Sequence, residues 1–217
     1  KCFTGGGSGV QSAGWFNKEI TSLADLQGLN FRITGLGALV MQKIGVNAIS
    51  MPPGEIFPAL QAGTLDGAEW VGPNNDLAFG FQKIMSHMYA PSFSDIHGGI
   101  EFGINLEAWN SLPEDLQQII QVCAEAETEL LMSDGFYGNV LGLKQIKDET
   151  DVVVGQFPDD VWDALRAATH EVMAEVRESD ELIARIHDSF FGFVEQAVDY
   201  RKSYEQELYV QRAKFFS

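Results

Sequence analysis

The chain has 217 residues, of which 45% are apolar and 11% aromatic, enough to build a hydrophobic core and to exclude intrinsic disorder. Its 14 Lys and Arg residues against 31 Asp and Glu residues give a formal net charge of −17, which argues against a nucleic acid or an anionic membrane surface as partner. No apolar run approaches the ~18 residues that a membrane-spanning helix needs. The two cysteines, Cys2 and Cys123, lack CxxC spacing and support neither a disulfide framework nor a zinc site.

The first part of the chain alternates short strands with short helices. Residues 1–14 are rich in glycine and are predicted as a loop or an extended crossing segment. Ser22 and Asp25 fit the two positions of a capping box, so we expect a short helix there. Further on, strands are predicted over 29–33, 46–51 and 65–73, with helices over 36–45 and 55–62. Strands and helices that alternate at this spacing favour an α/β fold.

Helices dominate the rest of the chain. They are predicted over 77–89, from Glu114 onward and from Pro158 onward, with short strands over 99–106 and 152–154. Ser111 and Glu114 have the spacing of a second capping box. The chain is expected to end in a long helical tract from Ser189 to Phe216 with an apolar stripe along one side. We expect this tract to pack on another lobe or on another subunit.

Arg32 stands alone in the first part of the sequence, because the next arginine is Arg166. It ends a predicted strand, and small ligands bind at strand ends in α/β folds. Its planar guanidinium suits two hydrogen bonds to a carboxylate. An ordinary surface arginine is an equal alternative at this point.

Glu69 and Trp70 end another predicted strand. A carboxylate in this apolar stretch is costly to bury unless it is paired. It is therefore either exposed beside a core tryptophan or turned toward a cation or a bound polar ligand. The oxygen donors that follow, over residues 74–76, suit a hard cation such as Na⁺ or Ca²⁺ better than zinc.

The remaining patterns give weak support for other chemistry. Gly6 to Val10 lacks the final glycine of a hydrolase elbow, and His170 lacks a second histidine four residues later. His97 lies in a predicted loop over 92–99, where it could face a cleft. A nucleophile, a zinc protease motif and a phosphate-binding loop are therefore not indicated.

Four segments resemble the substrate-binding receptors of tripartite ATP-independent periplasmic (TRAP) transporters. The similarity is greatest to the branch that binds 2-oxo and 2-hydroxy acids together with a metal ion. The segments are residues 11–16 (QSAGWF), 23–33 (LADLQGLNFRI), 55–73 (EIFPALQAGTLDGAEWVGP) and 105–109 (NLEAW). The resemblance runs from Gln11 to the C-terminus.

The resemblance implies a two-lobe α/β fold like that of periplasmic binding proteins, with crossing hinge strands and long C-terminal helices. Such receptors are longer than this chain, so we expect the N-terminal part of one lobe to be missing from it. Residues 1–69 and 101–155 would form mainly the second lobe. Residues 70–100 and part of 156–217 would pack on the first lobe or on a partner subunit.

The resemblance also implies the site. The arginine that matches Arg32 holds the substrate carboxylate. Residues that match Gln11, Glu69 and Trp70, the last through its carbonyl oxygen, bind the Na⁺ or Ca²⁺ ion that bridges to the ligand. Asp95 matches an acidic metal-binding position, where the family usually has glutamate. Gln11, Trp70 and Asp95 are expected to contact the substrate as well.

The function implied by the resemblance is that of a periplasmic solute receptor, not an enzyme. It would bind a small 2-oxo or 2-hydroxy monocarboxylate and deliver it to the membrane permease subunits of a TRAP transporter. The protein would form a homodimer through its C-terminal helix. The residues leave one alternative open, an enzyme acting on a small carboxylic acid, with Asp95 or His97 as the acid–base group near Arg32 and Glu69.

Overall fold

The computed structural model describes residues 1–95 and 97–216, so Ile96 and Ser217, which fall inside two of the expected ranges, lie outside it. The chain forms two compact units, Lys1–Ala168 and Thr169–Ser217. The first unit contains both β-sheets and the helices up to the start of α6 (Asp159–Glu178). The second unit is helical.

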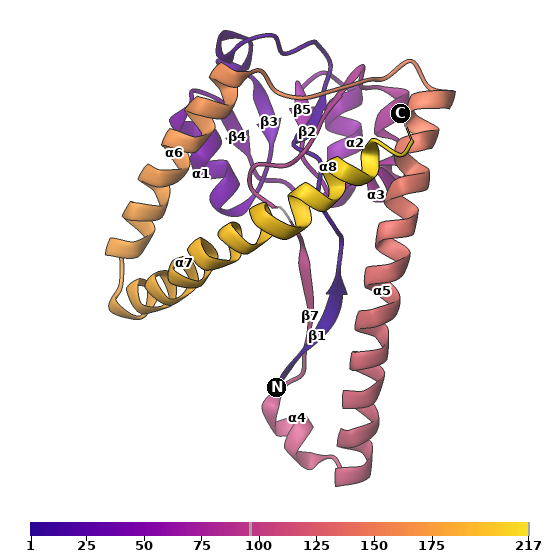
Figure 1. Cartoon of the computed structure of the whole chain (residues 1–217), viewed down its shortest axis with the longest axis vertical. Helices are drawn as coiled ribbons and strands as arrows, with labels where there is room; N and C mark the ends of the chain where they lie inside the picture. The colour runs from indigo at the N-terminus through magenta and orange to yellow at the C-terminus, as the bar shows by residue number, and fades with distance from the viewer. Residues whose placement is uncertain (96, 217) are drawn as a thin grey trace. The chain divides into compact units, whose positions relative to one another are not determined.

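A six-stranded mixed sheet is the centre of the first unit (Figure 1). Its strands, in spatial order, are β4 (Asn47–Ile49), β3 (Asn30–Arg32), β5 (Gly67–Ala68), β2 (Gly14–Phe16), β6 (His87–Tyr89) and β8 (Val153–Gly155). β3 runs parallel to β4 and β5, and β6 runs parallel to β8, whereas β2 is antiparallel to both of its neighbours. The expected α/β fold is confirmed.

Short helices connect the first strands: a 3-10 turn (Leu23–Leu26), α1 (Gly35–Lys43) and α2 (Pro53–Gln61). The capping box is present, because the Ser22 backbone N–H donates to the Asp25 carboxylate at 3.0 Å. The sheet core holds Phe16 and Phe31, whose buried rings stack with centroids 4.9 Å apart. Gly67 lies between them, and a Cβ at this position would collide with the Trp15 carbonyl oxygen.

The helix predicted over 77–89 is wrong. That stretch contains the end of α3 (Pro73–Phe79), a 3-10 turn (Phe81–Lys83) and strand β6. Gly80, at φ +83°, ends α3 in a left-handed conformation that favours glycine. Met88 and Tyr89 are buried in the sheet, and a short apolar run of this kind does not distinguish a strand from a helix.

The second capping box is also absent. Ser111 is the last residue of α4 (Leu106–Ser111), and its hydroxyl donates to the Ala108 carbonyl oxygen at 2.8 Å. Helix α5 (Glu114–Glu149) begins instead after Pro113, whose fixed φ suits a helix start. The sequence pattern was ambiguous here because a helix end and a helix start lie only three residues apart.

A narrow two-stranded ribbon leaves the six-stranded sheet (Figure 1). It pairs β1 (Cys2–Gly7) with β7 (Gly99–Gly103) in antiparallel register, which confirms the extended alternative for the start of the chain. Helix α5, 36 residues and roughly 54 Å long, runs beside it. We call β1, β7, α4 and residues 114–131 of α5 the stem.

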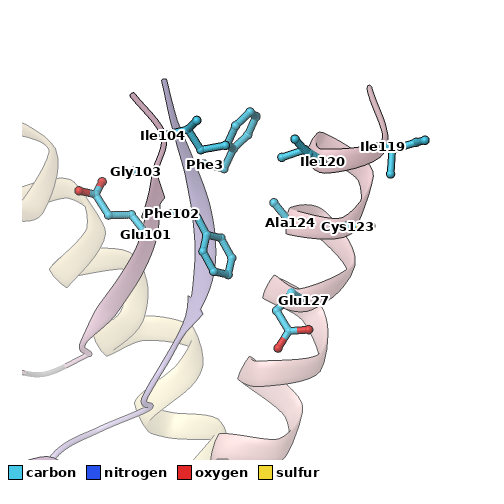
Figure 2. A pocket seen from close by; sticks show the side chains of 10 residues that line it. All are labelled: Phe3, Glu101, Phe102, Gly103, Ile104, Ile119, Ile120, Cys123, Ala124 and Glu127. Carbon is cyan, nitrogen blue, oxygen red and sulfur yellow. The ribbon is translucent and has the colours of Figure 1, made fainter. Parts of the chain in front are cut away.

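An apolar groove of about 610 Å³ lies in the stem, between the ribbon and α5 (Figure 2). Phe3, Phe102 and Ile120 point into it from the two sides. Its lining residues are Phe3, Glu101, Phe102, Gly103, Ile104, Ile119, Ile120, Cys123, Ala124 and Glu127. Phe102 remains 44% exposed and Ile119 56% exposed, so the stem presents an apolar surface.

The other end of α5 is part of the sheet core. Ile146 is fully buried, and Gly142 approaches α3 so closely that a Cβ would be 2.9 Å from the Asn74 backbone nitrogen. Asn139 lies on α5 between the stem and Gly142. Its side-chain amide donates to the Ser8 carbonyl oxygen at 2.8 Å and accepts from the Asn74 N–H at 3.2 Å. One helix thus connects the end of β1 with the start of α3.

The second unit consists of the end of α6, α7 (Glu181–Arg201), a π-helical turn (Lys202–Gln206) and α8 (Glu207–Ala213). The expected C-terminal helical tract is present. Arg177 and Asp188 join α6 to α7 through two hydrogen bonds of 2.7 and 2.8 Å. The exposed apolar side chains of the second unit include Leu182, Ile186, Phe190, Phe193, Val198, Tyr204, Leu208 and Phe215.

The expected division into lobes stays a prediction. Residues 70–100 supply α3 and β6 to the same compact unit as residues 1–69, in addition to any packing on another lobe or subunit. In the part of the chain that the structure describes, no helix combines the length and the apolar character that crossing a membrane requires.

Candidate functional site

Arg32 ends β3 and is buried, with 6% of its surface exposed. Its neighbour across the parallel ladder is Ala68, so Glu69 follows at the same edge of the sheet. Arg32 Nη1 donates to the Glu69 carbonyl oxygen at 2.6 Å and lies 3.4 Å from Glu69 Oε2. Its Cζ is 5.2 Å from the centroid of the Trp70 ring, a cation–π contact that orients the guanidinium plane. The surface alternative for this arginine is therefore wrong.

The Arg32 guanidinium has unused hydrogen-bonding capacity. Its Nε is buried and lacks a hydrogen-bond partner among the described residues. Burial lowers the pKa of Arg32, while the charge of Glu69 raises it. A buried donor without an acceptor costs about 1–3 kcal/mol, so the arginine favours any acceptor that can reach it.

Glu69 is also buried, with 4% of its surface exposed, which excludes the exposed alternative. Burial raises its pKa from 4.5 to about 8; Arg32 lowers it, and the charges of Asp95 and Asp76 raise it further. Burial therefore disfavours the ionised form of this carboxylate. A cation bound to it would favour the ionised form.

Gln11 lies between β1 and β2 and is 8% exposed. Its Nε2 donates to Ser8 Oγ at 3.1 Å, whereas its Oε1 is buried without a partner among the described residues. The next residue, Ser12, donates its backbone N–H to the Val71 carbonyl oxygen at 2.8 Å. The Gln11 segment thus lies against the segment that follows Trp70.

The loop after β6 carries Asp95 and His97, and both are exposed. The Asp95 backbone N–H donates to Ser92 Oγ at 3.1 Å, and the Ser92 N–H donates to the Gln11 carbonyl oxygen at 2.9 Å. This loop therefore adjoins the Gln11 segment. Within residues 1–95 and 97–216, no hydrogen bond joins the side chains of Gln11 or Asp95 to Arg32 or Glu69.

Asp76, one of the oxygen donors over residues 74–76 that were expected to suit a cation, is fully buried. Its carboxylate accepts from Trp15 Nε1 at 2.7 Å, Ser12 Oγ at 3.3 Å and the Val71 N–H at 3.1 Å. Burial raises its pKa from 3.8 to about 6, although these hydrogen bonds lower it. Asp76 therefore holds β2, the Gln11 segment and the Trp70 segment together instead of supplying oxygens to a cation.

The donor set suits a hard cation. Gln11 Oε1 is buried without a partner among the described residues and Glu69 is a buried carboxylate, whereas the role of the Trp70 carbonyl oxygen stays a prediction. Among the described residues there is no cluster of three His, Cys, Asp or Glu side chains that could hold a metal ion. Amide, carbonyl and carboxylate oxygens are the ligands that Ca²⁺ and other hard cations prefer.

Comparison with known proteins identifies the family. The model for the bacterial extracellular solute-binding proteins of family 7, DctP, matches residues 3–180. The chain belongs to this family. The resemblance to the receptors of TRAP transporters is thereby confirmed.

A curated relative in Nostoc sp. is named monocarboxylate 2-oxoacid-binding periplasmic protein. It is 34% identical over 197 residues, which cover 89% of this chain and 53% of the relative. This chain thus spans about half the length of that protein.

Two solved structures of TRAP solute-binding proteins have the same fold. The protein from Pseudoalteromonas atlantica, with bound sodium and pyruvate, is 36% identical with a TM-score of 0.90, and the match covers 97% of this chain and 64% of that protein's chain. The protein from Bordetella bronchiseptica, a dimer with calcium and picolinate bound in its occupied site, is 33% identical with a TM-score of 0.91. This match covers 99% of this chain and 63% of that protein's chain. The mixed sheet and long helices of this DctP-family chain are those of the TRAP periplasmic proteins.

The buried Asp76 carboxylate gives this family member a testable pH dependence. Because folding raises the pKa of this acid, the protonated form is favoured in the folded state, and stability is lost as the pH rises through 4 to 6. We expect the wild-type protein to lose roughly 2–3 kcal/mol of unfolding free energy, relative to Asp76→Asn, between pH 4 and pH 7.5.

Denaturant unfolding of both proteins at several pH values measures this difference. At pH 4 both side chains are neutral in the folded state, so the difference there reports mainly the hydrogen bonds that the amide cannot reproduce. Parallel pH profiles of the two proteins would contradict the raised pKa.

Proposed function

We propose that the protein is a periplasmic solute receptor of a TRAP transporter that binds a small 2-oxo or 2-hydroxy monocarboxylate through a bridging Na⁺ or Ca²⁺ ion. One observation carries this proposal. Arg32 Nε and Gln11 Oε1 are a buried donor and a buried acceptor, both without a partner among the described residues. The donor favours an anion and the acceptor favours a cation, and a metal carboxylate supplies both.

Each residue of the proposed site has a distinct role. Arg32 binds the ligand carboxylate, and its contact with Trp70 holds the guanidinium in place. Gln11 through its amide oxygen, Glu69 through its carboxylate and Trp70 through its carbonyl oxygen bind the cation, with Asp95 from the neighbouring loop. Gln11, Trp70 and Asp95 also border the substrate. The cation supplies the positive charge that allows an anionic ligand to approach Glu69.

The relatives support the substrate class. The Nostoc protein is named for 2-oxo acids, and the two solved structures hold pyruvate with sodium and picolinate with calcium. Pyruvate and picolinate share one chemical feature, a carboxylate beside a second donor atom in chelating position. A ligand with this feature can bind the metal ion with two atoms while its carboxylate reaches the arginine.

We infer a binding protein and not an enzyme. The family is one of extracellular solute-binding proteins, and the Nostoc relative is a periplasmic binding protein. Both descriptions support a location in the periplasm and delivery of the ligand to membrane permease subunits. The enzymatic alternative, with Asp95 or His97 as acid–base group, would instead change the mass of the bound acid during incubation.

We propose that the stem carries the first lobe of the receptor. About a third of each of the two solved chains lies outside the part matched here. The groove between β1, β7 and α5 offers Phe102 and Ile119 as exposed apolar contacts for further chain. A lobe in this position would cover an apolar surface that is otherwise in water.

The second unit supports the proposed homodimer. Along α7 and α8, Phe193 is 69% exposed and Tyr204 66% exposed, and the Bordetella structure is described as a dimer. We expect light scattering to show a dimer at micromolar concentration, and deletion of the residues after Phe193 to leave a monomer with an unchanged melting temperature of the first unit. A monomeric complete protein would contradict the proposal.

The carboxylate contact is tested at Arg32. We expect Arg32→Ala to weaken pyruvate binding at least tenfold, because charge-assisted hydrogen bonds contribute ~1.5–3 kcal/mol each. Arg32→Lys should recover only part of this loss, since an ammonium group has no planar fork. Calorimetry measures both, with Arg166→Ala, an exposed arginine on α6, as control. Wild-type affinity in Arg32→Lys would exclude a bidentate contact.

The bridging cation is tested at Glu69. We expect Glu69→Gln to lower the affinity for pyruvate and for the ion together, because each completes the binding site of the other. The exposed Glu55 on α2 provides the control variant Glu55→Gln, which should match the wild type. Titrations compare Na⁺, Ca²⁺ and a chelated, Na⁺-free buffer. Unchanged wild-type affinity in the last buffer would show that no cation takes part.

A further inference from the structure

We propose, building on the function above, that Ser8 and Gly98 are positioning residues that hold the Gln11 amide with its oxygen toward the cation. In this role they determine that the acid binds together with a metal ion and not alone. Among the described residues, neither forms a hydrogen bond to Arg32, Glu69 or Trp70, and neither belongs to the set predicted from the sequence.

Ser8 is fixed from several directions. Its backbone N–H donates to the Gly98 carbonyl oxygen at 3.0 Å, and its own carbonyl oxygen accepts from the Asn139 amide at 2.8 Å. Its hydroxyl oxygen accepts from the Gly98 N–H at 3.1 Å. The hydroxyl group therefore has a defined place between the β7 end of the Asp95 loop and the Gln11 side chain.

The single proton of this hydroxyl is already used. Ser8 Oγ donates it to the Gly9 carbonyl oxygen at 3.1 Å, and the oxygen accepts from Gln11 Nε2 at 3.1 Å. A serine hydroxyl has one proton and two lone pairs. A reversed Gln11 amide would bring its oxygen against the Ser8 oxygen and compete with Gly9 for that proton. The bonds of Ser8 thus select the orientation in which Gln11 Oε1 points away from it.

This orientation has a chemical consequence. The Gln11 side chain is more than nine-tenths buried, and its Oε1 lacks a partner in the described part of the chain. An amide that presented its N–H₂ group would bind a carboxylate directly. An amide that presents its oxygen repels a carboxylate and attracts a cation, so the ligand anion needs the metal ion between itself and Gln11.

Gly98 provides the space for this arrangement. A Cβ at this position would lie 2.6 Å from Gln11 Nε2 and 2.8 Å from Ser8 Oγ, closer than side-chain atoms approach. Both obstacles are the ends of side chains, so the Gln11 amide and the Ser8 hydroxyl group would move and the backbone would stay. At the adjacent Gly99, a Cβ has no neighbour within 4 Å. Neither glycine has a left-handed backbone conformation, so that conformation does not penalise alanine at either position.

The two glycines form a matched pair for the experiment. Pyruvate binding to the full-length protein is measured by calorimetry in Na⁺ or Ca²⁺ buffer and in a chelated, Na⁺-free buffer, together with the melting temperature without ligand. We define the cation-dependent gain as the ratio of the pyruvate affinity with the cation to the affinity without it. For Gly98→Ala we expect this gain to fall at least fivefold, while the melting temperature stays unchanged. Gly99→Ala should keep the wild-type gain.

Ser8 gives an independent test that does not depend on added volume. Ser8→Ala should reduce the cation-dependent gain at least fivefold, and Ser8→Thr, which retains the hydroxyl group, should restore most of it. A wild-type gain in Ser8→Ala would overturn the proposal, as would equal losses in Gly98→Ala and Gly99→Ala. If the wild-type protein binds no pyruvate in any buffer, the proposed function fails, whereas wild-type binding with unchanged variants rejects only the role of Ser8 and Gly98.

Discussion

Arg32 and Glu69 are buried side by side at the ends of two parallel strands, and their incomplete pairing determines what the surrounding site can bind. Removing two charges from water costs several kcal/mol each, and one contact of 3.4 Å between them does not repay that cost. The pKa of Glu69, raised to about 8, is one expression of the deficit, and the unpartnered Arg32 Nε is another. A ligand that brings an anion for the arginine and a cation for the glutamate removes both deficits at once.

The surrounding structure keeps these charges in place. Asp76 joins three segments near the site through Trp15, Ser12 and Val71 without belonging to the site. Helix α5 adds a second connection through Asn139, which reaches the end of β1 and the start of α3. The hydrogen bonds of Asp76 and Asn139 thus fix the segments that carry the unpartnered Gln11 Oε1 and its neighbours, which favours a preorganised binding site.

The sequence predicted several of the strands and the α/β fold, and it singled out Arg32 and Glu69 as separate candidate binding residues, because alternation, capping residues and strand ends are local signals. It did not predict β6, since a short apolar run such as the one before Tyr89 satisfies helix and strand patterns alike. The structural roles of Asp76 and Ser8 were not predicted, for another reason. Their partners Trp15 and Gly98 are 61 and 90 residues away, and only the folded chain brings them together. The burial of Arg32 was equally unpredictable. A strand end can be recognised from neighbouring residues, but its burial depends on segments that are distant in the sequence.

The continuity of α5 has a mechanical consequence. From Gly138 to its start at Glu114 the helix extends for roughly 36 Å without interruption, and Gly138 and Gly142 allow its other end to approach α3 closely. A change of direction of α5 at its contact with α3 is therefore largest at the far end of the helix. A bend of only about 10° at that point would displace the far end of the stem by roughly 6 Å. Any repacking at the contact between α5 and α3 would therefore shift the far end of the stem much further than it shifts the sheet.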